Sequence, residues 1–365
     1  MDVLIFIIVL VALIVVHEFG HFVVAKWAGM KVEEFGIGYP PRAIGFKKGE
    51  TEYTLNWLPF GGFVKIYGED ESEAVGGADA GRSFAARPRI LQALVLVAGI
   101  MMNLLFAWVI LSTTLMLGMP RALSADEIPD VPDAKLVVAD VLPGSPAASA
   151  GLRAGDAILS AQSGEHAFKD VVPEAFTSFI SSSEEELSLS VLRGEETLTL
   201  SATPVEGVAP NDPSRKALGV AIATVGTVSV PPLSAPIEGA KLTWNVIQET
   251  AVGLYHFFGG LLTFSADLSQ VSGPVGIVGA VGSASEGGVV ALLTLTAVIS
   301  VNLALINIIP VPALDGGRLL FVAIEAVIRR PLPKGLAGAL NTVGFALLIL
   351  LMLVVTISDI WKLVS

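Results

Sequence analysis

The chain has 365 residues, of which 53% are hydrophobic and 15% charged, and its formal net charge is −12. A soluble protein usually carries about 25% charged residues. Together with a mean hydropathy of +0.72, this composition indicates a multispan membrane protein with some soluble mass. The acidic balance argues against nucleic acid as a partner. The absence of cysteine excludes disulfides, a thiolate nucleophile and cysteine zinc ligands.

The first predicted span begins at Val3 and runs to about Ala25. No basic residue precedes it and no small-residue cleavage site stands before its histidines, so we expect a retained helix rather than a signal peptide. His17 and His21 are four residues apart and share one helix face. Two neutral imidazoles so placed can bind zinc, and Glu18 lies where it can serve as a base. Ionisable side chains at membrane depth cost on the order of 3 kcal/mol, which makes them functional candidates.

A loop rich in lysine and arginine follows the first span. Within it, apolar flanks around Lys47-Lys48-Gly49-Glu50 predict a hairpin, and the apolar run after it is broken by proline and glycine. We predict a membrane-associated β region over 44–66, because irregular backbone at membrane depth must be shielded from lipid. Its edge is expected to hold an extended substrate segment. The residues predicted to bind substrate there are Gly61, Gly62, Phe63 and Val64.

The second predicted span lies within 90–120, the third within 287–314 and the fourth at 335–358. Each is long enough to cross about 30 Å of hydrocarbon. Basic short loops stay in the cytoplasm, which places both termini and the segment 121–286 on the opposite side. Residues 237–267 have helical periodicity and could lie on the membrane surface as an amphipathic helix or form a fifth span. A fifth span would reverse the third span, so we keep four.

The segment between the second and third spans contains a domain of its own. Predicted strands and short helices alternate over 134–224, and the pattern V-L-P-G-S-P-A-x-x-A-G-L-x-x-G-D-x-I resembles a bacterial PDZ domain. PDZ domains bind extended peptides by adding a strand to a sheet edge. The predicted organisation is therefore 1–120 with two spans and the β region, 134–224 as one PDZ domain, 225–286 as a connecting segment and 287–365 with two spans.

A zinc ion bound by two histidines needs a third protein ligand, which leaves one coordination position for water. Pro310 and Pro312 break the third span near its cytoplasmic end. Asp315 is the natural candidate, because no other acidic residue stands between positions 286 and 325. Counted along the helices from the outer side, His17 and the end of the third span reach similar depths, roughly 22 and 27 Å. Asp315 could alternatively cap the helix that follows it.

These motifs together resemble the site-2 protease family, and most closely its bacterial RseP-like group. The resemblance rests on H-E-F-G-H in the first span, N-x-x-P-x-P-x-L-D-G at the end of the third, and a PDZ domain between spans. It implies that His17, His21 and Asp315 bind Zn²⁺, that Glu18 activates water, and that Asn307 contacts the substrate backbone. Many RseP-like members carry two PDZ domains, whereas this chain shows one.

The predicted fold is an α-helical polytopic membrane protein with four transmembrane helices, a membrane-associated β-hairpin and one inserted α+β PDZ domain. The predicted function is a zinc intramembrane protease of the bacterial inner membrane, with its active site near the cytoplasmic side. Its partners would be the lipid bilayer, single-span substrates such as anti-sigma factors or remnant signal peptides, and a peptide at the PDZ groove. The alternatives are a non-catalytic PDZ adaptor, which the intact motif argues against, and a metal transporter, which would need inverted repeats.

Overall fold

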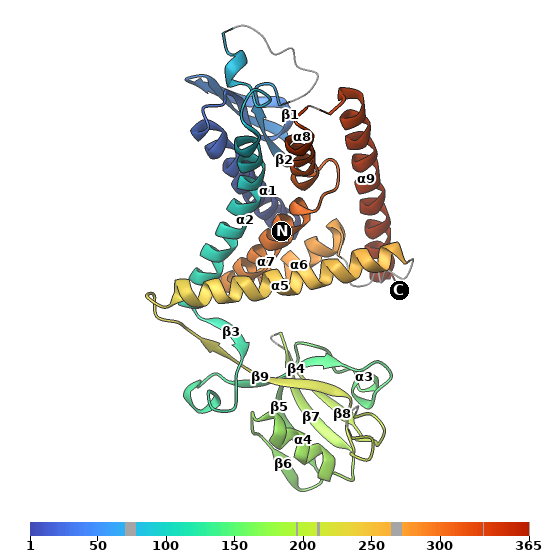
Figure 1. Cartoon of the computed structure of the whole chain (residues 1–365). Coiled ribbons are helices and arrows are strands. Elements are labelled where there is room, and N and C mark those ends of the chain that lie inside the picture. Colours follow the sequence, from blue (N-terminus) through green and yellow to red (C-terminus); the bar gives the residue numbers. More distant parts are fainter. Residues whose placement is uncertain (70–77, 195, 210–211, 264–271, 331, 365) are drawn as a thin grey trace. The chain divides into compact units, whose positions relative to one another are not determined.

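The computed structural model describes residues 1–69, 78–194, 196–209, 212–263, 272–330 and 332–364 (Figure 1). The chain forms two compact units: Met1–Met116 with Pro231–Ser365, and Leu117–Val230. The first unit contains α1 (Asp2–Trp27), β1 (Val32–Lys48), β2 (Thr51–Ile66), a 3-10 turn η1 (Ala80–Arg82), α2 (Arg89–Leu117), α5 (Ala235–Leu262), α6 (Pro274–Glu286), α7 (Val289–Ile308), α8 (Asp315–Ile328) and α9 (Lys334–Val364).

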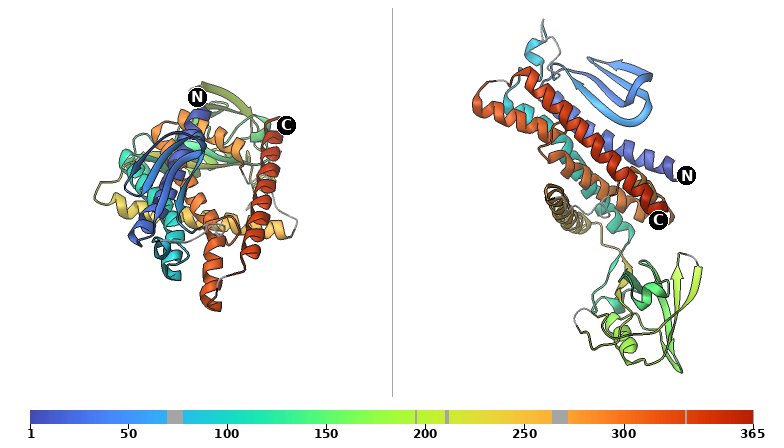
Figure 2. Two further views of the ribbon diagram at one scale, coloured as in Figure 1. Left: turned by 90° about the horizontal axis from the view of Figure 1, so that it is seen from above. Right: turned by 90° about the vertical axis from the view of Figure 1, so that its right-hand side faces the viewer.

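Four helices within the described residues are long and apolar enough to cross a membrane: Asp2–Trp27, Arg89–Leu117, Val289–Ile308 and Gly335–Trp361. They coincide with the four predicted spans. Helix α5 is not one of them, and it crosses the bundle at a steep angle instead of running along it (Figures 1 and 2). Trp108 of α2 anchors its start by donating a hydrogen bond from Nε1 to Pro236 O at 2.8 Å. The chain is therefore a polytopic membrane protein, and α5 is not among the described helices that fit a span by length and composition.

Strands β1 and β2 form a two-stranded antiparallel sheet. The predicted hairpin is confirmed, since Ile44 pairs with Leu55 and Phe46 with Tyr53 around a turn at Gly49, which has a φ of +66°. It is longer than predicted: β1 begins at Val32, and its first half pairs with the end of β2, so that Gly36 lies opposite Phe63. Helix α1 packs against β2, which brings the hairpin beside the histidine motif.

The second unit contains β3 (Met119–Ala122), a 3-10 turn η2 (Ile128–Asp130), β4 (Lys135–Val141), α3 (Pro146–Ser149), β5 (Ala157–Ser163), β6 (His166–Phe168), α4 (Pro173–Ser182), β7 (Leu187–Arg193), β8 (Glu196–Ala202) and β9 (Val220–Val228). Its strands follow the order β3-β9-β4-β5-β7-β8, with β6 paired to β5. Alternate residues of β4 and β7, such as Leu136 and Leu189, bury one sheet face against Phe176 of α4. This unit is wider than the predicted 134–224, because β3 pairs with the end of β9.

Glu325 of α8 forms its ion pair with another helix rather than with Arg329 four residues on. Its carboxylate contacts Arg89 Nη2 of α2 at 2.8 Å and accepts a hydrogen bond from Leu332 N. Arg329 terminates α8 with a φ of +54°, so the helix ends before an i,i+4 pair can form. The observed pair instead fastens the end of α8 to the start of α2.

The second unit contains a buried carboxylate whose contribution to the stability of the fold depends on pH. Asp156 is 1% exposed and accepts two hydrogen bonds from the Arg193 guanidinium, both at 2.7 Å, and one from Arg153 N. The Arg193 hydrogen bond holds the pKa of Asp156 below its usual value. A lowered folded-state pKa stabilises the fold above the unfolded-state pKa of about 3.9, and this stabilisation is lost as the pH falls through the folded value.

We therefore expect Asp156→Asn to lower the stability of this unit by about 3 kcal/mol at neutral pH, because it leaves Arg193 without its anionic partner. The measurement is proteolysis of the full-length protein within residues 117–230, followed from pH 6 to pH 3. The difference in cleavage rate between the wild type and the variant should shrink as the pH falls below about 4. A difference that stays constant over this range would contradict the assignment, and Asp140→Asn, at an exposed position of β4, is the control.

Candidate metal centre

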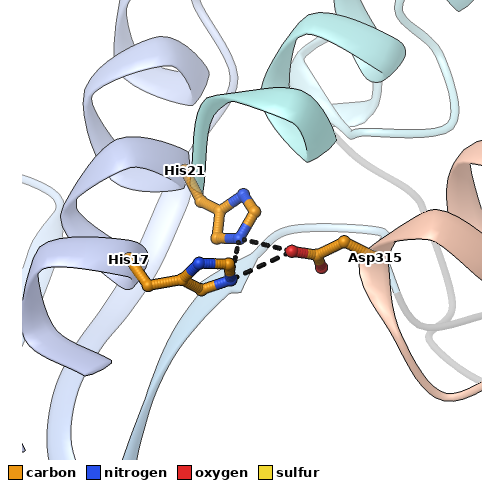
Figure 3. A group of neighbouring side chains, drawn as sticks. All are labelled: His17, His21 and Asp315. Atoms are coloured by element: carbon orange, nitrogen blue, oxygen red, sulfur yellow. Dashed lines mark hydrogen bonds and ion pairs between the residues drawn. The ribbon is translucent and has the colours of Figure 1, made fainter. Parts of the chain in front are cut away.

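Two histidine nitrogens and one carboxylate oxygen converge in the first unit (Figure 3). His17 Nε2 lies 3.0 Å and His21 Nε2 3.2 Å from Asp315 Oδ2, and the two Nε2 atoms are 3.1 Å apart. The histidines occupy successive turns of α1, whereas Asp315 opens α8, which follows the proline-broken end of α7. All three side chains are mostly buried. The residues predicted to be ligands are thus brought together from opposite ends of the chain.

The triangle has the size that a tetrahedral zinc site requires. Zinc bonds of about 2.0–2.1 Å to nitrogen and oxygen at tetrahedral angles separate neighbouring ligand atoms by about 3.3–3.4 Å. The observed edges of 3.0–3.2 Å are close to this value. Among the described residues, His17, His21 and Asp315 form the one group of three or more potential ligands. Two neutral imidazoles and a carboxylate leave the fourth position open, as in catalytic zinc sites.

A cavity of about 410 Å³ adjoins this triangle. Glu18 lines it from α1, and Gly61 and Gly62 line it from β2. Gly62 packs directly on α1, since a Cβ there would lie 3.4 Å from Glu18 Cγ and 3.2 Å from Ile14 Cγ2. The remaining lining residues come from α1, β1, α2, α7 and the start of α8 with the segment before it: Leu13, Ile14, His17, Tyr39, Asn103, Leu303, Asn307, Ala313, Leu314 and Asp315.

Two of the residues predicted to bind substrate are placed differently from the others. Asn307, Gly61 and Gly62 line the cavity, but Phe63 and Val64 are not among its lining residues. Phe63 stacks on Tyr39 with ring centroids 6.3 Å apart, and Val64 packs into the apolar cluster around Met30 and Val32. Because side chains of a strand alternate between its two faces, four consecutive residues cannot all face one cavity.

Helix α2 forms the rear wall of the site, which the sequence analysis did not predict. Gly99 gives the imidazoles their space, because a Cβ at this position would overlap His21 Nε2 and lie 2.8 Å from His17 Cε1. One turn before it, Val95 O accepts a hydrogen bond from His21 Nδ1 at 2.7 Å. One turn after it, the Asn103 amide lies 3.4 Å from His17 Nδ1. The available signal was a single asparagine, four residues after a glycine, in a predicted span that has no charged residue.

Helix α8 is fastened at both ends, which fixes Asp315. One turn after Asp315, Arg318 Nη1 contacts Glu69 Oε1 at 2.7 Å, and the far end of α8 is held by the Glu325–Arg89 pair. Gly316 lets the first turn of α8 pack on the end of α7, because a Cβ there would overlap the carbonyl oxygen of Ile308. The Asp315 carboxylate is therefore positioned by contacts of α8 with the segment that follows β2, with α2 and with α7.

Four spanning helices around a His-Glu-x-x-His motif and a remote aspartate define an intramembrane metallopeptidase. The chain belongs to Peptidase family M50, the site-2 protease family, whose model matches residues 5–351. It is 36% identical over 349 residues to a Clostridium perfringens protein provisionally named a zinc metalloprotease, covering 96% of this chain and 95% of that one. It is 30% identical over 435 residues to the regulator of sigma-W protease RasP of Bacillus subtilis, covering 98% of both chains.

A third relative, the zinc metalloprotease RasP of Geobacillus kaustophilus, is 29% identical over 437 residues, with 98% of this chain and 97% of that one covered. Family and relatives agree that the chain is a zinc-dependent metallopeptidase of the site-2 type, and that Zn²⁺ is its metal. The four apolar helices and the bacterial relatives fit a multi-pass bacterial membrane protein.

A substitution at Gly99 tests the placement of α2 against the two histidines. Replacing a helix-interior glycine by alanine normally favours the helix by about 1 kcal/mol, so any loss of zinc affinity in Gly99→Ala must come from displaced imidazoles. We expect the dissociation constant for zinc, measured by chelator competition on the purified protein, to rise at least about tenfold. Gly338→Ala in α9 is the matched control, because a Cβ there meets nothing within 4 Å. Unchanged affinity in Gly99→Ala would contradict the placement of α2.

Proposed function

We propose that this protein hydrolyses peptide bonds within the transmembrane segments of single-span membrane proteins, such as anti-sigma factors or remnant signal peptides, during regulated intramembrane proteolysis. The observation that supports this proposal best is the triangle formed by His17, His21 and Asp315 beside a cavity that Glu18 lines. In this assignment the two imidazoles and the carboxylate bind zinc. Three of the four spanning helices, α1, α2 and α7, line the cavity, which makes a membrane helix the natural substrate.

Zinc, when bound, supplies a polarised scissile carbonyl and an acidified water molecule. Glu18 takes the proton of the attacking water and delivers it to the leaving amine, which is general acid–base catalysis by one carboxylate. His21 keeps its ring orientation through the hydrogen bond from Nδ1 to Val95 O, so that Nε2 faces the triangle. The buried setting excludes bulk water from the charged groups and strengthens their interactions.

A membrane helix must unwind before cleavage, because its amide groups are engaged in helical hydrogen bonds. We assign the binding of the unwound segment to the β2 edge at Gly61 and Gly62 and to Asn307 on the opposite wall, all of which line the cavity. A strand edge supplies backbone donors and acceptors to an extended chain. Phe63 and Val64, which do not line the cavity, would act only by shaping that edge.

The central prediction concerns Glu18→Gln. This variant keeps the shape of the side chain but removes the base, so we expect cleavage of a tagged single-span substrate by the purified protein to fall by about 10²–10⁴-fold, with zinc content unchanged. Chelation of zinc should also stop cleavage, and readdition should restore it in the wild type only. Undiminished cleavage by Glu18→Gln would exclude the mechanism.

Three further variants separate metal binding from substrate binding in the same assay. His17→Ala and Asp315→Ala should lose zinc and cleavage together, because each removes one proposed ligand. Asn307→Ala removes a proposed substrate contact and is expected to lower kcat/KM while zinc content stays at the wild-type level. Loss of zinc in Asn307→Ala would move this residue from substrate binding to the metal centre.

We further propose that the unit Leu117–Val230 is a PDZ domain on the extracytoplasmic side, together with both termini, and that the active site lies near the cytoplasmic side of the bacterial inner membrane. Two observations support this. A cavity of about 270 Å³ lies within the unit, lined by Phe176 and Ile180 of α4 and by Val220 and Ile222 of β9, where a PDZ peptide would add as a strand. The loops at 26–89 and 329–334 carry the basic residues expected in the cytoplasm.

The absence of cysteine from the chain allows both parts of this proposal to be tested with single-cysteine variants. Thr177→Cys, on α4 beside the groove, should react with a membrane-impermeant maleimide added outside intact cells, and an extended peptide with an apolar C-terminal residue should slow that reaction. Lys48→Cys, next to the hairpin turn, should react only after permeabilisation. The reverse pattern of labelling would overturn the orientation, and labelling insensitive to the peptide would leave the unit only a steric role.

A further inference from the structure

The two proposed histidine ligands differ in how their second ring nitrogen is satisfied. A neutral histidine that binds a metal through Nε2 carries its proton on Nδ1, and that proton needs an acceptor. His21 has one, because Val95 O lies 2.7 Å from its Nδ1. The side chain of Asn103 contacts His17 Nδ1 at 3.4 Å. Both partners stand on the same stripe of α2, on either side of Gly99.

The amide of Asn103 is oriented for the opposite hydrogen bond. Its Nδ2 faces His17 Nδ1, and its Oδ1 is buried without a hydrogen-bond partner among the residues that the structure describes. A donor facing Nδ1 requires that nitrogen to be unprotonated, so the proton of His17 is on Nε2, where it can be donated to Asp315 Oδ2 at 3.0 Å. In this arrangement His17 Nε2 has no lone pair free for a metal.

Turning the amide by 180° gives Oδ1 a hydrogen-bond partner and frees the lone pair of His17 Nε2. The two ends of an asparagine amide have nearly the same size, so rotation about its last bond exchanges Oδ1 and Nδ2 without moving other atoms. Oδ1 then faces Nδ1–H of His17, the proton leaves Nε2, and the orphaned oxygen gains a partner. The amide is buried, since Asn103 is 1% exposed, and Ser300 Oγ of α7 donates separately to the Asn103 main-chain oxygen at 2.8 Å.

We propose that Asn103 is the positioning residue of His17: its side-chain oxygen accepts the Nδ1 proton in the zinc-bound protein and thereby frees Nε2 as a ligand. Helix α2 then orients both histidines, one through a main-chain carbonyl and the other through a side chain. Asn103 acts through His17 and needs no contact with the substrate. This inference rests on the proposed ligand set, and it concerns a helix that carries none of the proposed ligands.

The test compares three variants of the full-length protein, purified in detergent, stripped of metal and titrated with zinc against a chromophoric chelator. Asn103→Leu removes the acceptor and should raise the dissociation constant about 10–100-fold, the usual cost of losing such a partner. Asn103→Asp keeps an acceptor oxygen at the same place and should remain close to the wild-type value. Ser300→Ala removes the neighbouring hydrogen bond to the Asn103 main chain and should leave zinc affinity unchanged.

Each outcome of these zinc titrations either supports the proposed role of Asn103 or overturns it. If Asn103→Asp binds zinc as weakly as Asn103→Leu, or if Asn103→Leu binds as tightly as the wild type, the proposal is overturned. If Asn103→Leu does not fold, Asn103→Asp alone separates the two orientations, because a carboxylate can accept from Nδ1–H but cannot replace a donor. His17→Ala distinguishes this failure from failure of the ligand set: unchanged zinc affinity in His17→Ala would refute the ligand set itself.

Discussion

The close approach of α1 and α2 is the contact on which the metal centre depends. Two glycines permit it: a Cβ at Gly20 of α1 would overlap Ala98 O of α2, and a Cβ at Gly99 would overlap the His21 ring. Small residues let membrane helices approach until backbone and side chains meet directly. At this distance a carbonyl and an amide of α2 reach the Nδ1 atoms of both histidines. Buried polar groups at membrane depth are costly unless paired, so this packing also makes the motif tolerable there.

The hairpin and α8 complete the surroundings of His17, His21 and Asp315. The hairpin packs on α1 and closes one side of the cavity with two glycines, Gly61 and Gly62, whose missing side chains allow this close packing. The Arg318–Glu69 pair joins the first turn of α8 to the chain that leaves β2, so that the Asp315 carboxylate and the proposed substrate edge are held by one connection. A metal site and a strand edge that act on one peptide bond must be held in fixed positions relative to each other. Small displacements of the reacting groups lower the reaction rate strongly.

Local patterns in the sequence predicted much of this protein, and long-range packing accounts for what they missed. The four spans, the hairpin turn and the convergence of His17, His21 and Asp315 follow from apolar runs, turn residues and matched depths. The role of α2 does not, because it depends on which face of one apolar helix meets another, and an uncharged span has no periodicity that reveals its face. The first half of β1 and the Glu325–Arg89 pair were missed for the same reason, since their partners are remote in sequence.

The break between α7 and α8 explains why the fourth spanning helix is also part of the site. A continuous α7 would carry residue 315 roughly 10 Å beyond Ile308 along the helix axis. The chain instead turns at Ala313, with a φ of +78°, and Gly316 returns against the carbonyls of Ile308 and Ile309. The irregular backbone that results must be shielded from lipid. Helix α9 does this: Gly344 packs closely on Pro312, and Asn341 Oδ1 accepts a hydrogen bond from Ala313 N at 3.3 Å. Each spanning helix therefore supports the position of at least one of the three proposed ligands, although only α1 carries any of them itself.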